Sequence, residues 1–307
     1  MNRIDEIRRL KSAKRAVILA HYYTNAEVQQ VADFVGDSLA LSQKAAETDA
    51  DIILFAGVRF MAETAKVLSP DKKVLIPVPE AGCSLADSCN AEELRKAREE
   101  NPDHIVVSYV NTSVEVKALT DICCTSSNAL DIVRSIPEEQ PILFVPDRNL
   151  GSYINRCTGR NMKLWNGACL VHEEFAPAKI ARLKEAHPEA VVLVHPECKA
   201  EVVAMADYAG STAGILDYCA RPEVKEVIVV TESGILYEME QRYPDKRFYL
   251  VEPESGEGGC VACRDMKLVS LDNILSALRN ETPEVVIDED VRRRAEGSIV
   301  RMLQAKK

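Results

Sequence analysis

The sequence predicts an α/β fold of three similar units in a threefold internal repeat, each with a small parallel sheet between two layers of helices. One reason is an apolar run of four residues that recurs along the chain and ends just before His21, Tyr109 and His195. These three residues lie 88 and 86 residues apart. The runs are continuous rather than alternating, which is typical of parallel strands covered on both faces. We expect the active site at the centre, where the units meet.

A second reason is that three cysteines recur with a similar period. Cys83, Cys169 and Cys263 lie 86 and 94 residues apart, so one cysteine closes each third of the chain. Because no low-complexity linker separates the thirds, we expect them to pack as one body. The expected division is unit 1 at 1–85, unit 2 at 86–172, and unit 3 with the C-terminal helices at 173–307.

The first unit is expected to run in the order β-α-β-α-β after an amphipathic helix. Its apolar runs and helical spacings alternate, and Gly, Pro or N-capping residues bound them. The expected elements are helix 2–15, strand 17–20, helix 25–34, helix 39–47, strand 52–55, helix 60–68 and strand 74–78.

The other two units repeat this alternation. For the second we expect helix 92–100, strand 105–108, helix 113–119, a short strand at 121–124, a helix after 125–127, strand 142–145 and an irregular segment to 169. For the third we expect helix 177–186, strand 191–194, helix 200–206, a turn at 208–212, helix 213–220, strand 227–230, a further helix, strand 247–250, a Gly-rich segment at 256–259, and helices 271–280 and 289–305. We expect Gly57, Thr125 and Gly210 to close the second strands of the units. Their spacings of 68 and 85 residues imply a shorter first half in the middle unit.

Charge and composition narrow the class of partner. The net charge is −10 and no basic run occurs, which argues against a nucleic acid or an anionic membrane. No apolar stretch approaches the roughly 20 residues that span a bilayer. Ten cysteines without a secretory signal indicate metal, redox or core thiols rather than disulfides, and we expect the cytoplasm.

The three recurring cysteines are candidate metal ligands, because each lies in a loop with a nearby glycine where a thiolate can turn toward a metal. Their wide spacing differs from the compact run of ferredoxins and from paired zinc-ribbon motifs. Three thiolates on a four-iron cluster would leave one iron open to substrate, whereas zinc would take the thiolates alone or with His172. Ordinary buried thiols are the alternative without metal. Cys260 and Cys263 form a CxxC pair, of which one would be the third ligand.

Polar residues at the ends of the expected strands are candidates for substrate binding, since ligands of open α/β sheets bind beyond the carboxyl ends of strands. His195-Pro196-Glu197 suits proton transfer, although a turn with a solvated glutamate is the alternative. The hydroxyls at 126–127 and 211–212 begin helices, where they cap the helix or bind an anion. No Walker, GxGxxG or GxSxG motif occurs, which disfavours nucleotide binding and triad hydrolysis. Besides the cysteines, the residues expected at the centre are His21, Ser38, Tyr109, Ser126, His195 and Ser211.

A set of short motifs, in one order between about residues 15 and 270, resembles the quinolinate synthase family. The motifs lie at 21–23 (HYY), 36–39 (GDSL), 58–64 (VRFMAET), 109–111 (YVN), 124–128 (CTSSN), 146–151 (PDRNLG), 195–197 (HPE) and 210–212 (GST). That family folds as three similar α/β/α units around a pseudo-threefold axis and holds a 4Fe–4S cluster on one cysteine per unit, so the resemblance implies the same arrangement here. By resemblance the ligands here are Cys83, Cys169 and Cys263, and Cys260 is a spare. Many members have proline after the last ligand, where this chain has Arg264.

The resemblance implies condensation of iminoaspartate with dihydroxyacetone phosphate to quinolinate, with release of phosphate and water, in NAD biosynthesis. The open iron would act as a Lewis acid. The resemblance makes Glu197 the general acid–base and gives Tyr23, Tyr109 and His195 the positioning or protonation of intermediates. The residues that would bind substrate are His21, Ser38, Tyr109, Asn111, Ser126, His195, Glu197, Ser211 and Thr212.

The implied partners are the two small molecules, with L-aspartate oxidase or aspartate dehydrogenase as a supplier of the imine. Two other functions compete with this one. A zinc-dependent aldolase or lyase would use the same three thiolates without iron. An iron–sulfur redox sensor would use Cys260 and Cys263 and would need a partner surface, and it leaves the polar strand ends unexplained.

Overall fold

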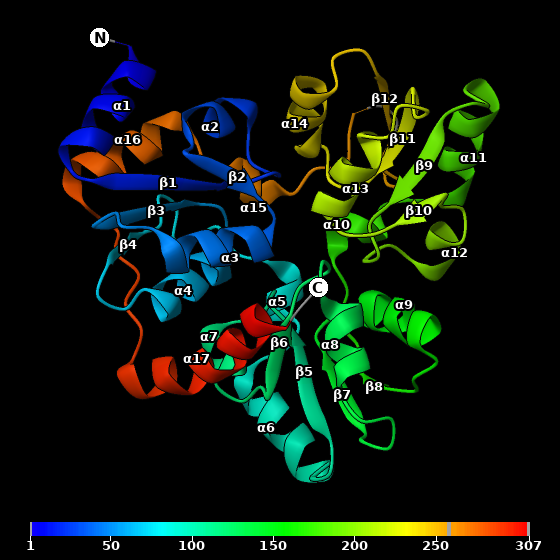
Figure 1. The fold of residues 1–307 in the computed structure, drawn as a ribbon, viewed down its shortest axis with the longest axis horizontal. Coiled ribbons are helices and arrows are strands. Elements are labelled where there is room, and N and C mark those ends of the chain that lie inside the picture. Colours follow the sequence, from blue (N-terminus) through cyan, green and yellow to red (C-terminus); the bar gives the residue numbers. More distant parts are fainter. Residues whose placement is uncertain (1, 257–258, 306–307) are drawn as a thin grey trace.

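The computed structural model describes residues 2–256 and 259–305, so two residues of the expected Gly-rich segment, 257 and 258, lie outside it. The described chain contains three sheets of four parallel strands, placed around a common centre (Figure 1). Their strand orders are β2-β1-β3-β4, β6-β5-β7-β8 and β10-β9-β11-β12, so each sheet has the same order of strands. The predicted α/β fold of three similar units is therefore confirmed.

The first sheet is built from the N-terminal part of the chain. Its central strands β1 and β3 are almost wholly buried, as the continuous apolar runs predict. The elements are α1 (Arg3–Ala13), β1 (Ala16–His21), α2 (Ala26–Val31), β2 (Phe34–Gly36), α3 (Ser38–Glu47), β3 (Ile52–Ala56), α4 (Arg59–Leu68) and β4 (Lys73–Leu75).

The second and third parts of the chain show the same alternation of helices and strands. The elements of the second part are α5 (Ser84–Asp87), α6 (Ala91–Glu100), β5 (Ile105–Tyr109), α7 (Val114–Lys117), β6 (Ile122–Cys124), α8 (Ala129–Ser135), β7 (Ile142–Val145), α9 (Arg148–Thr158), β8 (Lys163–Leu164) and α10 (Leu170–Glu173). Those of the third are α11 (Pro177–Ala186), β9 (Val191–Val194), α12 (Ala200–Val203), β10 (Tyr208–Ala209), α13 (Thr212–Cys219), β11 (Glu226–Val230), α14 (Ile235–Arg242) and β12 (Arg247–Leu250). Three helices complete the chain: α15 (Arg264–Lys267), α16 (Leu271–Asn280) and α17 (Glu289–Gln304).

The predicted alignment of the second strands was wrong in the first unit. Gly57 follows β3, whereas Thr125 and Gly210 follow β6 and β10. The edge strand equivalent to β6 and β10 is β2, which ends at Gly36. When the ends of β2, β6 and β10 are compared, their spacings along the sequence are close to those of the central strands, so the first half of the middle unit is not shortened. The expected helix at 25–34 had absorbed the start of β2, because three residues are too few to show a strand pattern.

The segment after β7 was expected to be irregular, but it forms the 11-residue helix α9. Asp147 caps this helix by accepting from the backbone N–H groups of Asn149 (2.7 Å) and Leu150 (3.0 Å). Gly159 ends it in the left-handed conformation, with φ of 72°. Its buried residues are Leu150, Gly151 and Ile154, and a glycine inside a helix is unfavourable, which hid this element in the sequence.

A hydrogen bond from backbone to aspartate repeats in all three units. Asp33, Asp121 and Asp207 each accept, at 2.7 to 2.8 Å, a backbone N–H near the start of the central strand of their sheet. These aspartates lie 88 and 86 residues apart, which is the period of the central strands. Each aspartate directly precedes an edge strand, β2, β6 or β10, so the hydrogen bond holds that edge strand against the neighbouring central strand of its sheet.

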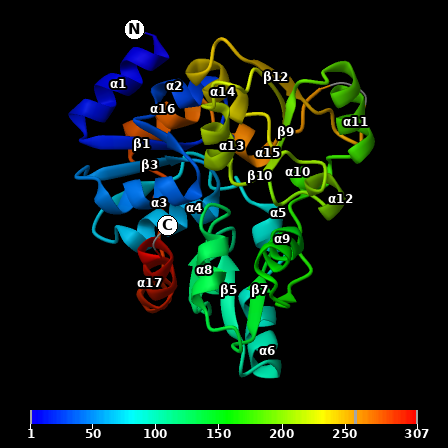
Figure 2. The same ribbon diagram turned by 45° about the vertical axis from the view of Figure 1, so that its right-hand side comes forward.

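The last two helices pack away from the third sheet. α16 lies against α1 and β3, and α17 lies against α4, α7 and β6, which joins the first sheet to the second (Figures 1 and 2). The division at 85 and 172 stays a prediction. Among the described residues, no helix combines the length and the apolar character that crossing a membrane requires.

Candidate active site

Each of the three predicted metal-binding cysteines occupies the same local structure. Cys83, Cys169 and Cys263 are the N-cap residues of α5, α10 and α15, which all have four residues. In each case the cysteine carbonyl accepts a hydrogen bond from the backbone N–H four residues on, at 3.0 to 3.2 Å. An N-cap residue has extended backbone, so its side chain stands clear of the helix that follows.

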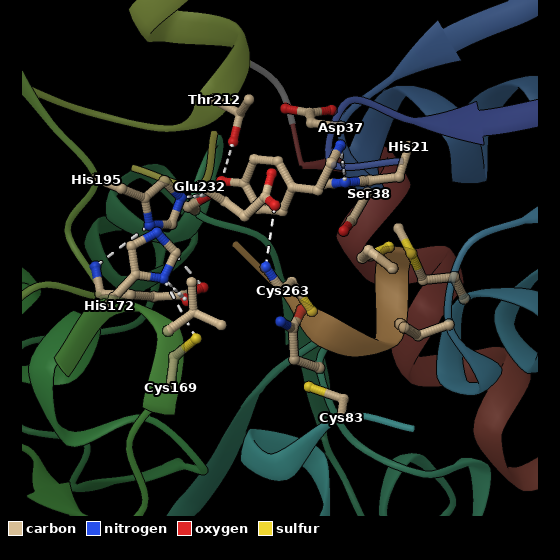
Figure 3. A pocket seen from close by; sticks show the side chains of 18 of the residues that line it. His21, Asp37, Ser38, Cys83, Cys169, His172, His195, Thr212, Glu232 and Cys263 are labelled. Atoms are coloured by element: carbon tan, nitrogen blue, oxygen red, sulfur yellow. Dashed lines mark hydrogen bonds and ion pairs between the residues drawn. The ribbon is translucent and has the colours of Figure 1, made fainter. Parts of the chain in front are cut away.

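The three cysteines line one cavity of about 660 Å³, counted to its open mouth. In Figure 3 they lie at one end of this cavity, with Thr212 and Asp37 at the other. All of the expected site residues except Ser211 line it. The lining comprises His21, Tyr23, Asp37, Ser38, Val58, Phe60, Met61, Gly82, Cys83, Tyr109, Asn111, Thr125, Ser126, Cys169, Val171, His172, His195, Glu197, Thr212, Glu232, Cys263 and Met266.

Ser211 lies beside the cavity as the N-cap of α13. Its hydroxyl accepts a hydrogen bond from the backbone N–H of Gly214 at 3.1 Å. The next residue, Thr212, is the one that lines the cavity. Of these two expected residues, Ser211 therefore uses its hydroxyl to cap a helix, and Thr212 lies at the site.

The cysteine side chains are neutral thiols in the absence of a metal. Burial raises the pKa of Cys83 to about 12, and the nearby Cys263 adds to the shift. Burial likewise raises the pKa values of Cys169 and Cys263. A metal that binds here must displace these protons, which makes its binding stronger at higher pH.

The two strand-end histidines have equivalent positions in the first and third units. Nδ1 of His21 accepts from the backbone N–H of Tyr23 at 3.1 Å, and Nδ1 of His195 accepts from that of Glu197 at 3.3 Å. Burial lowers the pKa of each histidine to about 3, so both imidazoles are neutral. With Nδ1 accepting, the proton is on Nε2. Each ring is thus a neutral donor, and Nε2 of His195 lies 3.3 Å from the hydroxyl of Ser126.

Both carboxylate oxygens of Glu197 have partners in the cavity. Its Oε1 accepts from the Tyr109 hydroxyl at 2.5 Å, and its Oε2 lies 2.9 Å from Nδ1 of His172. Burial acts to raise the pKa of Glu197. The imidazoles of His172 and His195 and the hydrogen bonds from His172 and Tyr109 outweigh burial and hold the pKa below its ordinary value. The carboxylate is therefore ionised and able to accept a proton.

The network continues from His172 into the other units. Nε2 of His172 lies 3.0 Å from the Thr231 hydroxyl, which lies 2.8 Å from the hydroxyl of Tyr23. Tyr23 in turn lies 2.8 Å from the hydroxyl of Thr212. Hydrogen-bonded side chains from all three units thus form one chain, along which protons can move between Glu197 and Tyr23.

His172 was considered from sequence only as a fourth zinc ligand, and Thr231 and Glu232 were not identified as site residues. The i, i+3 spacing of Cys169 and His172 on one helix was the available signal. In the structure Nδ1 of His172 is 3.3 Å from the Cys169 sulfur. One ligand atom each of Cys169, His172 and Glu197 lies within 4.8 Å of the others, which makes this triad a possible metal site.

The cavity also contains polar groups without charge. The side-chain oxygen of Asn111 is buried and has no hydrogen-bond partner among the described residues. Leaving such a group without a hydrogen bond lowers the stability of the folded chain unless a ligand satisfies it.

Ser38 begins α3, where Asp37 caps the helix and also accepts from the Ser127 hydroxyl at 2.6 Å. That contact joins the ends of two edge strands, β2 and β6.

Three α/β units that share one cavity, with thiols at one end and a buried Tyr–Glu–His network beside them, define a three-unit α/β enzyme with a possible metal cofactor. The family model described as Quinolinate synthetase A protein matches residues 5–304. The chain belongs to this family.

Curated relatives agree over almost the full length. The chain is 52% identical over 298 residues to the quinolinate synthase of Microcystis aeruginosa, covering 97% of this chain and 93% of the relative. It is 50% identical over 300 residues to that of Trichodesmium erythraeum, covering 98% and 93%. It is also 50% identical over 303 residues to that of Chloroherpeton thalassium, covering 99% and 94%.

Proposed function

We propose that this chain is a quinolinate synthase that condenses iminoaspartate with dihydroxyacetone phosphate and serves NAD biosynthesis. The observation that carries the proposal is one cavity shared by the three cysteines and the Tyr109–Glu197 pair. Membership of the family and the relatives' shared name support it. The supply of the unstable imine by an L-aspartate oxidase or an aspartate dehydrogenase is part of the proposal.

We infer that Cys83, Cys169 and Cys263 hold a 4Fe–4S cluster. The residues fit such a group, because thiolates are its usual ligands and these three are half-buried in one cavity with apolar walls such as Phe60 and Met266. When bound, the cluster supplies an open iron that acts as a Lewis acid on a substrate oxygen.

Anionic substrates are held by neutral donors in this proposal. Iminoaspartate has two carboxylates and dihydroxyacetone phosphate has a phosphate, while the chain has a net charge of −10. The Nε2–H groups of His21 and His195 donate without bringing charge, and hydroxyls of Ser38, Ser126 and Thr212 line the same space. Ser211 contributes through the backbone N–H groups at the start of α13, which favour an anion.

Proton transfer is assigned to the buried network. Glu197, which is ionised, takes the proton that leaves carbon during enolisation, and the Tyr109 hydroxyl at 2.5 Å stabilises its charge. His172, Thr231 and Tyr23 carry protons to the hydroxyl groups that leave as water. Asn111 orients the imine through its unpaired side-chain oxygen, which accepts from the imine N–H.

The test is an anaerobic absorbance spectrum with iron and sulfide analysis of the purified chain, followed by an assay with enzymatically generated iminoaspartate. We expect about four irons per chain, broad visible absorbance and quinolinate formation. Cys83→Ala, Cys169→Ala and Cys263→Ala should each lose the absorbance. Cys260→Ala is the matched control and should retain it, because Cys260 is exposed.

A zinc-dependent lyase is the second candidate, and the Cys169–His172–Glu197 triad favours it. A single zinc ion on those three ligands would leave a coordination position for substrate. Such a protein would be colourless, would contain one zinc per chain and would keep its activity in air. That result would replace the iron–sulfur proposal.

A further inference from the structure

A fully buried carboxylate lies beside the third cysteine. Glu232 follows β11 at the end of the strand and has no exposed surface. Its Oε1 accepts from the backbone N–H of Cys263 at 3.0 Å and lies 2.9 Å from Nζ of Lys267. Its Oε2 accepts from the backbone N–H of Gly234 at 2.6 Å. The bond to Cys263 is drawn in Figure 3.

Lys267 extends this contact to the first unit. Its Nζ also donates to the backbone carbonyl of Tyr23 at 2.6 Å, just beyond the end of β1. The side chain of Asn25 donates to the backbone carbonyl of Lys267 at 3.1 Å. One lysine therefore joins a carboxylate of the third sheet to the backbone that carries the catalytic candidate Tyr23.

The same short helix is tied to the loop of the first cysteine. Oδ1 of Asp265, in α15, accepts from the backbone N–H of Gly82 at 3.1 Å, directly before Cys83. The helix after Cys263 is thus held on three sides, by Glu232, by the Tyr23–Asn25 turn and by Gly82. A helix of four residues has little stability of its own, so its position depends on these contacts.

We propose that the ion pair of the buried Glu232 with the partly exposed Lys267 is a positioning device that fixes the Cys263 thiol toward the metal site and couples it to the docking of the third unit on the first. The inference rests on the proposed function in taking Cys263 as a ligand. Both residues act through backbone that they hold, and neither is assigned contact with substrate.

Removing one partner should be worse than removing both. Lys267→Met leaves a buried carboxylate without its cation, which is strongly unfavourable. Glu232→Gln removes the charge, and with its oxygen in place for Cys263 and Lys267 it directs its amide donor at the Gly234 N–H. The double variant loses both charges, so its effects should be smaller than the sum of the single ones. Lys267→Arg retains the charge.

The experiment measures cluster loss to an iron chelator under anaerobic conditions, and alkylation of individual cysteines in the metal-free chain by mass spectrometry. For Glu232→Gln and Lys267→Met we expect iron loss roughly tenfold faster than in the wild type, as for other partners that orient metal ligands. In the metal-free chain, Cys263 should react faster in these variants while Cys83 and Cys169 do not.

Glu63→Gln is the matched control. Glu63 is also a buried glutamate that accepts from one cation (Arg59, 3.0 Å) and one backbone N–H (Val114, 3.1 Å), and these partners lie in α4 and α7 rather than in α15. It should leave both readouts at wild-type values. Unchanged iron loss in Lys267→Met, or equal acceleration at all three cysteines, would overturn the proposal. If the wild type takes up no cluster, the proposed function fails, and the alkylation pattern still decides this inference.

Discussion

At the scale of single residues, Glu197 and the two strand-end histidines differ in charge and in hydrogen-bonding role. His21 and His195 are neutral and donate from Nε2, because their Nδ1 atoms already accept backbone N–H groups. Glu197 holds the negative charge in contact with Tyr109 and His172. The site can therefore bind anions with its histidines and accept a proton with its glutamate at the same pH.

Glu197→Gln should abolish turnover while leaving the metal site loaded. The amide keeps the shape of the carboxylate but cannot accept the proton of enolisation, so we expect a loss on the order of 10² to 10⁴ in kcat. Quinolinate formation and iron content are measured on the same sample. Turnover within a few-fold of the wild type would assign the base to another residue.

The buried histidines should make the metal-free chain sensitive to acid. Their pKa values are about 3 in the folded chain against 6.5 ordinarily. The unfolded chain therefore binds more protons below pH 6.5, and stability falls as the pH drops from 6.5 toward 3. Between pH 6.5 and 5.5 we expect each histidine to contribute a loss of about 1 kcal/mol in the free energy of unfolding.

Urea unfolding at several pH values measures this effect. His195→Asn should have a shallower decline than the wild type over that interval. His187→Asn is the control, since His187 is partly exposed and stacks on Tyr249. Identical slopes in His195→Asn and the wild type would show that His195 is not held neutral.

At the scale of elements, the motif at 146–149 joins two parts of the site. Asn149, in the first turn of α9, donates to Oε1 of Glu173 at 2.7 Å and to the backbone carbonyl of Glu197 at 3.0 Å. Arg148 adds an ion pair with Glu173 at 3.1 Å. Glu173 ends the helix that begins after Cys169, so α9 fixes a cysteine helix relative to the Glu197 turn.

Asn149→Ala should lower activity more than stability. Both side-chain bonds are lost, and the Glu197 turn is then held by fewer contacts, for which we expect roughly a tenfold or greater loss in kcat. The melting temperature should fall by only a few degrees, since two part-buried hydrogen bonds contribute about 1 kcal/mol each. Asn161→Ala, at an exposed position between α9 and β8, should change neither. A fall in stability without a fall in kcat would contradict the positioning role.

The sequence predicts long buried strands well and short edge strands poorly. The central strands at 105–109 and 191–194 are continuous apolar runs, whose burial on both faces leaves no alternative pattern. β2 has three residues and β8 has two, and their pairing partners decide their structure. Among site residues, the cysteines and strand-end polar residues repeat with the units. Thr231 and Glu232 join the site through contacts with other units, which no local pattern records, and for His172 the only local signal was its i, i+3 spacing from Cys169.

At the scale of the whole molecule, the first and second units share a core and the third has cores of its own. One hydrophobic cluster contains Leu19 and Phe55 of the first sheet, Phe144 of the second and Ile299 of α17. Separate clusters cover the two faces of the third sheet. The first two units thus form one packed body that includes α17. The third unit is attached to it through polar contacts such as those of Lys267, and through Tyr22, which packs in one of the third unit's hydrophobic clusters.

Ile299→Ala should therefore loosen the pair of units that α17 joins, while leaving the third sheet unaffected. Ile299 is fully buried, and its truncation should cost about 2 to 5 kcal/mol in the free energy of unfolding. Hydrogen exchange should accelerate in β6 and α7, which pack on α17, before it does in β9 and β11. Arg293→Ala, on the exposed side of the same helix, should leave exchange unchanged. Equal acceleration in all three sheets would show that the chain unfolds as one cooperative body and would contradict the separation of the third unit from the packed first two.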